Sequence, residues 1–465
     1  MNESNSKMLG NMRIKKLLIK LAVPATAAMA FNALYNLVDT LFVGWGVSQD
    51  AIGALNIAYP IQMIVLAIGL MIGVGSGSVF SRAFGRRDER AMKRAVNTAL
   101  ILNITLSVTI SVTALIFLEP LLRFFGAVEA TESSAGNIHY AREYLRIVLI
   151  ALVPFSLSIV FNNLTRAEGR PKVAMNSLII GAVVNIILDP ILIFDAGLGL
   201  GVAGAAWGTV IGKSASFIYV FSRAMQRESS LMIDLKRIYQ VDFSMIREIL
   251  AVGSPSFVRT AMGGVLILIV NNLIILHAPE QATEYQSIYA VINRLIRFSL
   301  MPGFGLVQGM VPIVGFNFGA KFYGRVQAVI KFASTLLFIY FTSVFLLVMV
   351  FAEYLFMLFG STTDTFISEG AQAFRIVALG FSFVTFQVIL SSVYQAMGYP
   401  VKAFFIALSR RFIVYVPAAF LLASVFNLGV EGIWWAFFTA DLLTGSISYL
   451  MYRGEMKTLN VQYAS

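Results

Sequence analysis

The sequence predicts an all-α integral membrane protein with twelve transmembrane helices. These form two parallel six-helix repeats around a central cleft, related by a pseudo-two-fold axis along the membrane normal. Composition is the first observation behind this prediction: of 465 residues, 58% are hydrophobic and 13% charged, with a mean hydropathy of +0.80. Soluble domains are about 45–50% apolar and about 25% charged. The other two observations are long stretches without a charged residue and motifs that recur at a nearly constant offset along the chain.

Each span rests on an apolar stretch of about 20 residues, the length needed to cross a bilayer. The stretches 95–118 and 332–352, for example, carry no charged residue. Applied along the chain, this criterion places spans in order at 17–46, 52–80, 94–118, 138–163, 172–194, 202–224, 247–276, 285–313, 326–351, 372–396, 403–425 and 431–452.

Lysine and arginine set the predicted orientation, because cytoplasmic loops are enriched in these residues. Basic residues precede the first span and crowd the loops after even-numbered spans, whereas the other loops carry mainly acids. We therefore expect a multi-pass protein of the cell inner (plasma) membrane with both termini cytoplasmic. The same bias explains the net charge of +11 without nucleic acid as a partner.

Three motifs reveal an internal duplication. Arg-Ile-Val at 146–148 recurs at 375–377, and Ala-x-Gly-x-Pro at 167–171 recurs at 396–400. Leu-Gly-Val-x-Gly-x-x-Trp at 200–207 recurs at 428–435. Since each repeat holds six spans, both enter the membrane from the same side, which makes the repeat parallel. The expected organisation is an N-terminal lobe (1–222), a cytoplasmic connector (223–246) and a C-terminal lobe (247–465).

Two carboxylates lie inside predicted spans, where charges are costly and usually functional. Asp39 shares a helical face with a polar stripe of Asn32, Tyr35 and Asn36. Asp189 lies four residues after Asn185 and directly before Pro190, which we expect to break the helix and free a backbone carbonyl. Such a cluster of oxygens suits a hard cation; the alternative is that both carboxylates are merely hydrated near helix ends.

Other polar residues inside spans carry weaker signals. Asn162 and Thr209 alone favour helix–helix hydrogen bonds. Arg259, Arg294 and Arg297 need an anion or water nearby. Asp441 is the one clear acid within a second-half span, and we expect it to be structural and paired with a basic residue of that half.

The chain resembles the multidrug and toxic compound extrusion (MATE) family over nearly its whole length. The resemblance rests on Asn-Leu-Val-Asp-Thr-Leu-Phe-Val-Gly at 36–44, Ser-Arg-Ala-Phe-Gly at 81–85, Arg-Ala-x-Gly-x-Pro at 166–171, and Asn-Ile-Ile-Leu-Asp-Pro-Ile-Leu-Ile-Phe at 185–194. The last motif resembles the MepA-like and DinF-like branch.

The resemblance implies an antiporter that exports organic, often cationic, compounds or drugs against inward Na+ or H+. It implies a coupling site in the first lobe, at Asp39, Asn185 and Asp189 by motif and at Asn162 and Thr209 by spacing. Asp39 and Asp189 are the candidates for direct Na+ ligation. We assign substrate binding to Asn32, Tyr35, Asn36 and Arg294. We expect a monomer in the lipid bilayer with no cofactor beyond the coupling ion.

Competing functions remain open. A flippase of lipid-linked oligosaccharides on the same scaffold would use a basic cleft, which Arg259, Arg294 and Arg297 would favour and the two carboxylates oppose. An enzyme is not expected, because the chain has no cysteine and its two histidines, His139 and His277, are far apart in sequence. Duplicated lobes also argue against a permanent channel.

Overall fold

The computed structural model describes residues 3–46, 49–124, 138–226, 228–231, 233, 242–359 and 364–464. All regular elements in these ranges are helical. In chain order they are α1 (Glu3–Asn11), α2 (Ile14–Gly46), α3 (Gln49–Gly85), α4 (Glu89–Ile116), α5 (Leu118–Phe124), α6 (Ile138–Ile150), α7 (Leu152–Ala167), α8 (Pro171–Ile193), α9 (Gly201–Ala224), α10 (Phe243–His277), α11 (Ala282–Gly319), α12 (Tyr323–Met357), α13 (Asp364–Ala378), α14 (Phe381–Met397), α15 (Pro400–Leu408), η2 (Ser409–Tyr415), α16 (Val416–Phe420), η3 (Leu421–Val425) and α17 (Gly429–Ala464).

These helices account for the twelve predicted spans. Within the described ranges, eight helical segments are long and apolar enough to cross a membrane, and ten if two bent pairs each count as one span. Helices α9 and α17, of 24 and 36 residues, occupy the sixth and twelfth predicted positions. The chain is thus a multi-pass membrane protein, as predicted.

The fourth and tenth spans differ from the prediction because each is broken. Helix α6 meets α7 at a bend of 56°, and the segment Thr365–Ala378 of α13 meets α14 at 47°. The two breaks lie at equivalent places in the two repeats, next to Ala151 and Gly380. A hydropathy pattern runs smoothly across such a bend, so it could not reveal the breaks.

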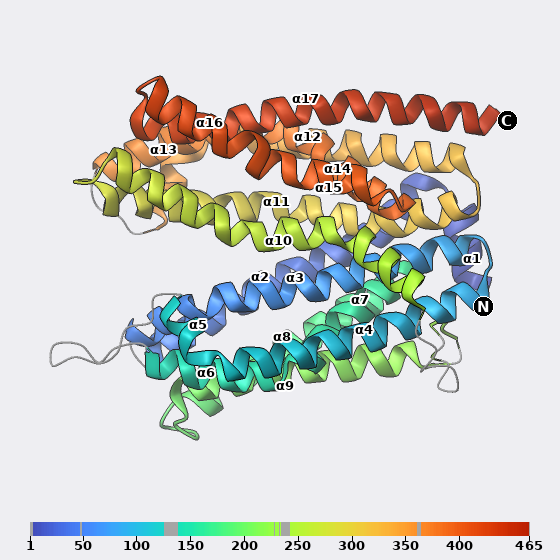
Figure 1. Cartoon of the computed structure of the whole chain (residues 1–465), viewed down its shortest axis with the longest axis horizontal. Helices are drawn as coiled ribbons and strands as arrows, with labels where there is room; N and C mark the ends of the chain where they lie inside the picture. The colour runs from blue at the N-terminus through green and yellow to red at the C-terminus, as the bar shows by residue number, and fades with distance from the viewer. Residues whose placement is uncertain are drawn as a thin grey trace.

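The two repeats form two bundles that lie beside each other. Figure 1 shows the helices from α2 to α9, blue to green, on one side and those from α10 to α17, yellow to red, on the other. Both chain ends lie at the same end of the molecule (Figure 1). The bundles meet mainly where α10 packs on α3 and α11 packs on α2.

Near the chain termini, glycines allow the backbones of α3 and α11, one from each bundle, to touch. A Cβ on Gly85 of α3 would strike the carbonyl oxygen of Phe316 in α11, and one on Gly319 of α11 would strike that of Arg82 in α3. Each helix thus offers its terminal glycine to the other, a reciprocal pattern typical of two-fold symmetry. An ion pair of 2.9 Å between Arg82 and Glu248 crosses the same interface.

Helix α10 begins with a side-chain cap. Asp242 accepts hydrogen bonds from the backbone amides of Ser244 and Met245, at 3.1 and 3.2 Å. A further hydrogen bond from the Ser244 hydroxyl, at 2.7 Å, lowers the pKa of the Asp242 carboxyl below its ordinary value. Arg94 of α4 forms an ion pair of 3.0 Å with the same carboxylate and so joins the first bundle to the cap.

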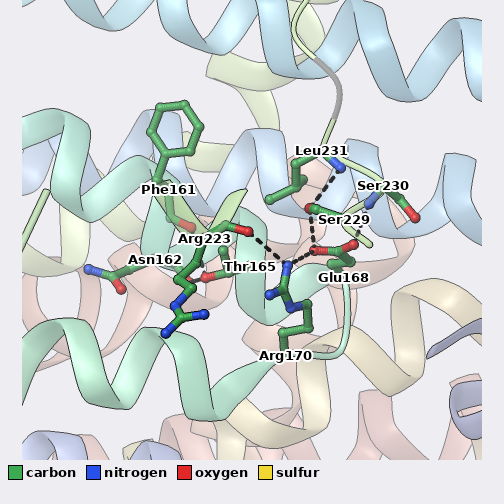
Figure 2. Close-up of polar contacts among 9 residues, drawn as sticks. All are labelled: Phe161, Asn162, Thr165, Glu168, Arg170, Arg223, Ser229, Ser230 and Leu231. Atoms are coloured by element: carbon green, nitrogen blue, oxygen red, sulfur yellow. Dashed lines mark hydrogen bonds and ion pairs between the residues drawn. The ribbon is translucent and has the colours of Figure 1, made fainter. Parts of the chain in front are cut away.

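The segment after α9 is anchored by Glu168, which caps α7 and is fully buried. Its carboxylate accepts hydrogen bonds from the Ser229 hydroxyl at 2.9 Å and from the Ser230 backbone amide. Arg170 forms an ion pair with it at 3.6 Å and donates to the carbonyl of Arg223 at 3.1 Å (Figure 2). This network ties the start of the inter-repeat segment to the first bundle.

Candidate cation-coupling site

Helix α8 carries the core of the site on one face. Asn185 and Asp189 are one turn apart, and Asn185 Nδ2 donates to Asp189 Oδ1 at 2.9 Å. Both side chains are buried, with exposed fractions of 2% and 0%. The expected helix break at Pro190 is wrong, because α8 runs through it and ends at Ile193. Because proline has no N–H, the carbonyl of Ile186 still loses its usual helical donor, but the helix continues past it.

Glycines of α9 allow the backbone of α9 to pack closely against this face of α8. A Cβ at Gly208 would strike Asp189 Oδ1, and one at Gly212 would lie 3.0 Å from the Asn185 Cβ. Gly204 lies on the same face of α9, and a Cβ there would lie 2.5 Å from the carbonyl oxygen of Leu192. Small residues four apart are the usual means of close helix packing in membranes. The backbone of α9 therefore forms one wall of the site.

Helix α2 supplies the second carboxylate. It continues without interruption through Pro24 to Gly46, and α2 packs extensively on α8. Asp39 thereby approaches Asp189, and the two carboxyl groups are close enough to interact directly. Two ionised carboxylates this close repel one another, so the pair needs a shared proton or a cation between them.

Four oxygens in this part of the first bundle have no donor. Among the described residues, nothing donates to Asp39 Oδ1, Asp189 Oδ2, Asn185 Oδ1 or Asn162 Oδ1. Buried polar atoms are almost always hydrogen-bonded. Unused acceptors from carboxylates and carboxamides are the ligand set that a hard cation prefers. The donor set therefore fits Na+, and the carboxylate pair alone fits H+.

Asn162 is linked to α8 and α9 through a chain of serines. Its Nδ2 donates to the Ser158 hydroxyl at 3.3 Å, which bonds to Ser216 at 2.9 Å, and Ser216 bonds to Ser177 at 2.7 Å. These hydroxyls join α7, α9 and α8. The chain fixes the orientation of the Asn162 carboxamide and leaves its oxygen free to act as an acceptor.

The structure adds residues that sequence reasoning did not assign to the site. Buried Tyr144 of α6 neighbours the side chains of Thr209 and Gln62 and lies within electrostatic reach of Asp39. Lys213 of α9 also lies within electrostatic reach of Asp39. Its ammonium sits over the Tyr35 ring, 4.5 Å from the centroid. Lys213 follows Thr209 by one helical turn, a spacing that could have placed it on this face.

Other predicted residues are placed less directly. Asn32 is half-buried, and the side chain of Asn36 lies outside the described residues. Arg294 of α11 is exposed and belongs to the second bundle, so it is not part of this constellation. In the described ranges no three His, Cys, Asp or Glu residues gather around one point. The carboxylate pair with its amide oxygens is thus the candidate cation site of this part of the chain.

The fold and the site together define a class of polytopic membrane proteins. Its members have two repeated helical bundles, and one bundle contains a pair of carboxylates. The family model described as MatE matches residues 24–191 and 261–421, one segment in each repeat. The chain therefore belongs to the MATE family, as its motifs predicted.

Comparisons with relatives agree along the whole chain. The multidrug export protein MepA of Staphylococcus aureus (strain MRSA252) is 25% identical over 437 residues, covering 94% of this chain and 93% of MepA. MepA of Staphylococcus haemolyticus is 25% identical over 461 residues, covering 97% and 96%.

Solved structures show the same fold. A MATE crystal structure in the bent conformation superposes with a TM-score of 0.90 at 24% identity, covering 99% of each chain. A multidrug resistance MATE transporter of the MOP superfamily in an outward-facing conformation gives a TM-score of 0.87 at 24% identity, covering 98% of each chain. The predicted arrangement of twelve helices in two repeats is that of these structures.

Proposed function

We propose that this chain is a cation-coupled multidrug antiporter that exports organic, often cationic, compounds by alternating access. The single observation that carries the proposal is the contact between Asp39 and Asp189, surrounded by oxygens without donors. The MepA relatives, named as multidrug export proteins, support drugs as the exported class.

The coupling step follows from the charge of the pair. A proton or Na+ that enters between Asp39 and Asp189 removes their repulsion and draws α2 and α8 together. Loss of the ion leaves a surplus negative charge, which favours an organic cation and the nearby ammonium of Lys213. The drug must prefer the ion-free form for exchange to occur.

The membrane potential sets the driving force for this exchange. One inward charge gives about 2.3 kcal/mol per 100 mV, and about 1.4 kcal/mol corresponds to a tenfold concentration ratio. A neutral drug is then concentrated roughly 40-fold per ion.

We further propose that residues 1–222 and 247–465 move as two lobes joined by 223–246, with both termini cytoplasmic. The anchoring of Ser229 and Ser230 on Glu168 supports this division, because it holds the start of the connector against the first lobe. The glycine-mediated contacts near the termini would then close the cytoplasmic side.

The test is ethidium efflux from energised vesicles, with Na+ and pH gradients imposed separately. Asp39→Asn and Asp189→Asn should each insert and fold, because a neutral side chain is cheaper in the membrane than a carboxylate. Each should lose gradient-driven efflux, and the double variant should be little worse, since residues that act as a unit are non-additive.

Asp195→Asn is the matched control. It removes an exposed carboxylate only six residues from Asp189 and should leave efflux nearly unchanged. Gradient-driven efflux that survives in both single variants would refute the coupling site. The gradient that drives the wild-type protein identifies the coupling ion.

A further inference from the structure

The second bundle contains two arginines that lie together without a counter-ion. Arg411 of η2 donates from Nη1 to the backbone carbonyl of Arg259 in α10. Both side chains are half-buried. No carboxylate of the described residues forms an ion pair with either guanidinium. Uncompensated cations inside a membrane bundle are costly and call for an anionic partner.

The neighbouring charges do not supply that partner. Asp441 lies within electrostatic reach of Arg411, but its carboxylate is paired with Arg410 and is neutralised there. Arg297 of α11 adds a further positive charge within electrostatic reach of Arg411. The two unpaired guanidiniums therefore lie in a region of net positive charge.

A buried hydroxyl beside them also lacks a partner. Tyr415 is only 2% exposed, and nothing among the described residues bonds its hydroxyl. Its ring lies 4.4 Å from that of Phe437, which also neighbours Tyr289 at 6.3 Å. Tyr289 lies within electrostatic reach of both Arg411 and Tyr415. Spare hydrogen-bond donors thus adjoin an aromatic wall.

The backbone of this region is unusual as well. Arg411 and Tyr415 both belong to η2, a seven-residue π-helical segment. Such segments are rare and frequently occur at functional sites. The cluster also faces the other bundle, because neighbouring Arg297 donates to the Tyr59 hydroxyl of α3 at 2.8 Å.

The two bundles differ in the charge they hold. The first holds the carboxylates of Asp39 and Asp189, and the second holds the guanidiniums of Arg259 and Arg411. At the repeat offset, Asp39 and Asp189 correspond to Leu268 and Ala418, while Ala30 and Ala182 stand where the second half has Arg259 and Arg411. Neither pair of charges therefore has a charged counterpart in the other repeat.

We propose that Arg259, Arg411 and Tyr415 form a binding site for an anionic oxygen group, a carboxylate or a phosphate, on an aromatic or amphiphilic compound. The inference rests on the proposed transport function and extends its substrates from cations to zwitterions. The guanidiniums donate to the anionic oxygens, and the wall of Tyr289 and Phe437 packs on the apolar part.

The experiment compares two dyes that differ in one group. Rhodamine 110 carries a free carboxylate, and rhodamine 123 is its methyl ester. Binding of each to the purified full-length protein in phosphatidylcholine nanodiscs is followed by fluorescence anisotropy without any gradient. Arg259→Gln and Arg411→Gln should each weaken rhodamine 110 binding about tenfold, equivalent to about 1.4 kcal/mol. Rhodamine 123 binding should stay unchanged or tighten, because a repulsive charge is removed.

Lys331→Gln is the charge control, since it removes an exposed cation of the same bundle on α12. Arg411→Lys keeps the charge and should retain part of the rhodamine 110 affinity, which separates recognition from folding. Nanodiscs with phosphatidylglycerol distinguish the ligand's source: competition with rhodamine 110 identifies a lipid phosphate as an occupant, and no competition favours a soluble anion.

Equal loss of both dyes, or no loss of either, in the two glutamine variants would overturn the proposal. Its failure is distinct from that of the proposed function. Dye binding is measured without a gradient, whereas the coupling site is judged by gradient-driven ethidium efflux in the Asp39 and Asp189 variants.

Discussion

Asp441 offers a quantitative test of how the second bundle is held together. Its carboxylate, 1% exposed, receives two hydrogen bonds from the Arg410 guanidinium, whose side chain is 24% exposed. The pair joins α17 to η2. Removing one partner of a buried ion pair costs about 3–5 kcal/mol because the other charge is left uncompensated.

The two single variants should lose different amounts of stability. Asp441→Asn leaves a guanidinium that water reaches in part, so we expect a loss of about 2–3 kcal/mol, below the range for a fully buried charge. Arg410→Gln strands a carboxylate that water does not reach, so we expect about 3–5 kcal/mol. The double variant leaves two neutral amides. With a coupling energy of about 2–3 kcal/mol it should lose about 3–5 kcal/mol, well below the roughly 5–8 kcal/mol expected if the two changes were independent.

The measurement is a double-mutant cycle on thermal unfolding of the purified protein, followed by tryptophan fluorescence. Efflux per folded molecule is measured in parallel and should fall less than stability. Normal stability with abolished efflux in Asp441→Asn would show that this carboxylate serves transport. Additive losses in the double variant would show that the pair does not interact as the structure indicates.

Three further predictions concern the site and the cap of α10. Gly208→Ala should abolish gradient-driven efflux and cost about 1–3 kcal/mol of stability, because the new methyl would strike Asp189; normal efflux would contradict the close packing. Lys213→Gln removes a competitor for Asp39 and should lower the ion concentration for half-maximal efflux about threefold to tenfold, consistent with about 1 kcal/mol of charge interaction. Asp242→Ala should destabilise by about 1 kcal/mol at neutral pH, whereas Asn, also a good cap, should lose less. Because the folded pKa of Asp242 is lowered, its contribution is present above about pH 4 and disappears at lower pH; a pH-independent difference in melting temperature would contradict this.

The sequence alone determined the number of spans and their pairing into repeats. Hydropathy identifies membrane helices because every backbone polar group must be satisfied within the segment. The repeated motifs then set six spans per half. Within one helix the period of 3.6 residues determines which side chains share a face. That is why Asn185 and Asp189 were placed together correctly, and they hydrogen-bond in the structure.

For Asp441, the sequence also predicted the charge of the residue that pairs with it, but not which residue this is. Asp441 was expected to pair with a basic residue of its own half, and it pairs with Arg410. Several second-half cations met that description. Which of them lies opposite depends on the rotation of η2 against α17, and the π-helical turns that set this rotation leave no mark in hydropathy.

Only the tertiary structure decided what meets across helices. Asp39 and Asp189 are 150 residues apart in sequence, and their contact depends on the packing of α2 against α8. The close packing of α9 on α8 depends on three glycines of α9, because any side chain at these positions would clash with α8. Lys213 was not singled out in the sequence, and the fold places it within electrostatic reach of Asp39. The period of a helix determines its faces, but the close approach of neighbouring backbones determines which faces meet.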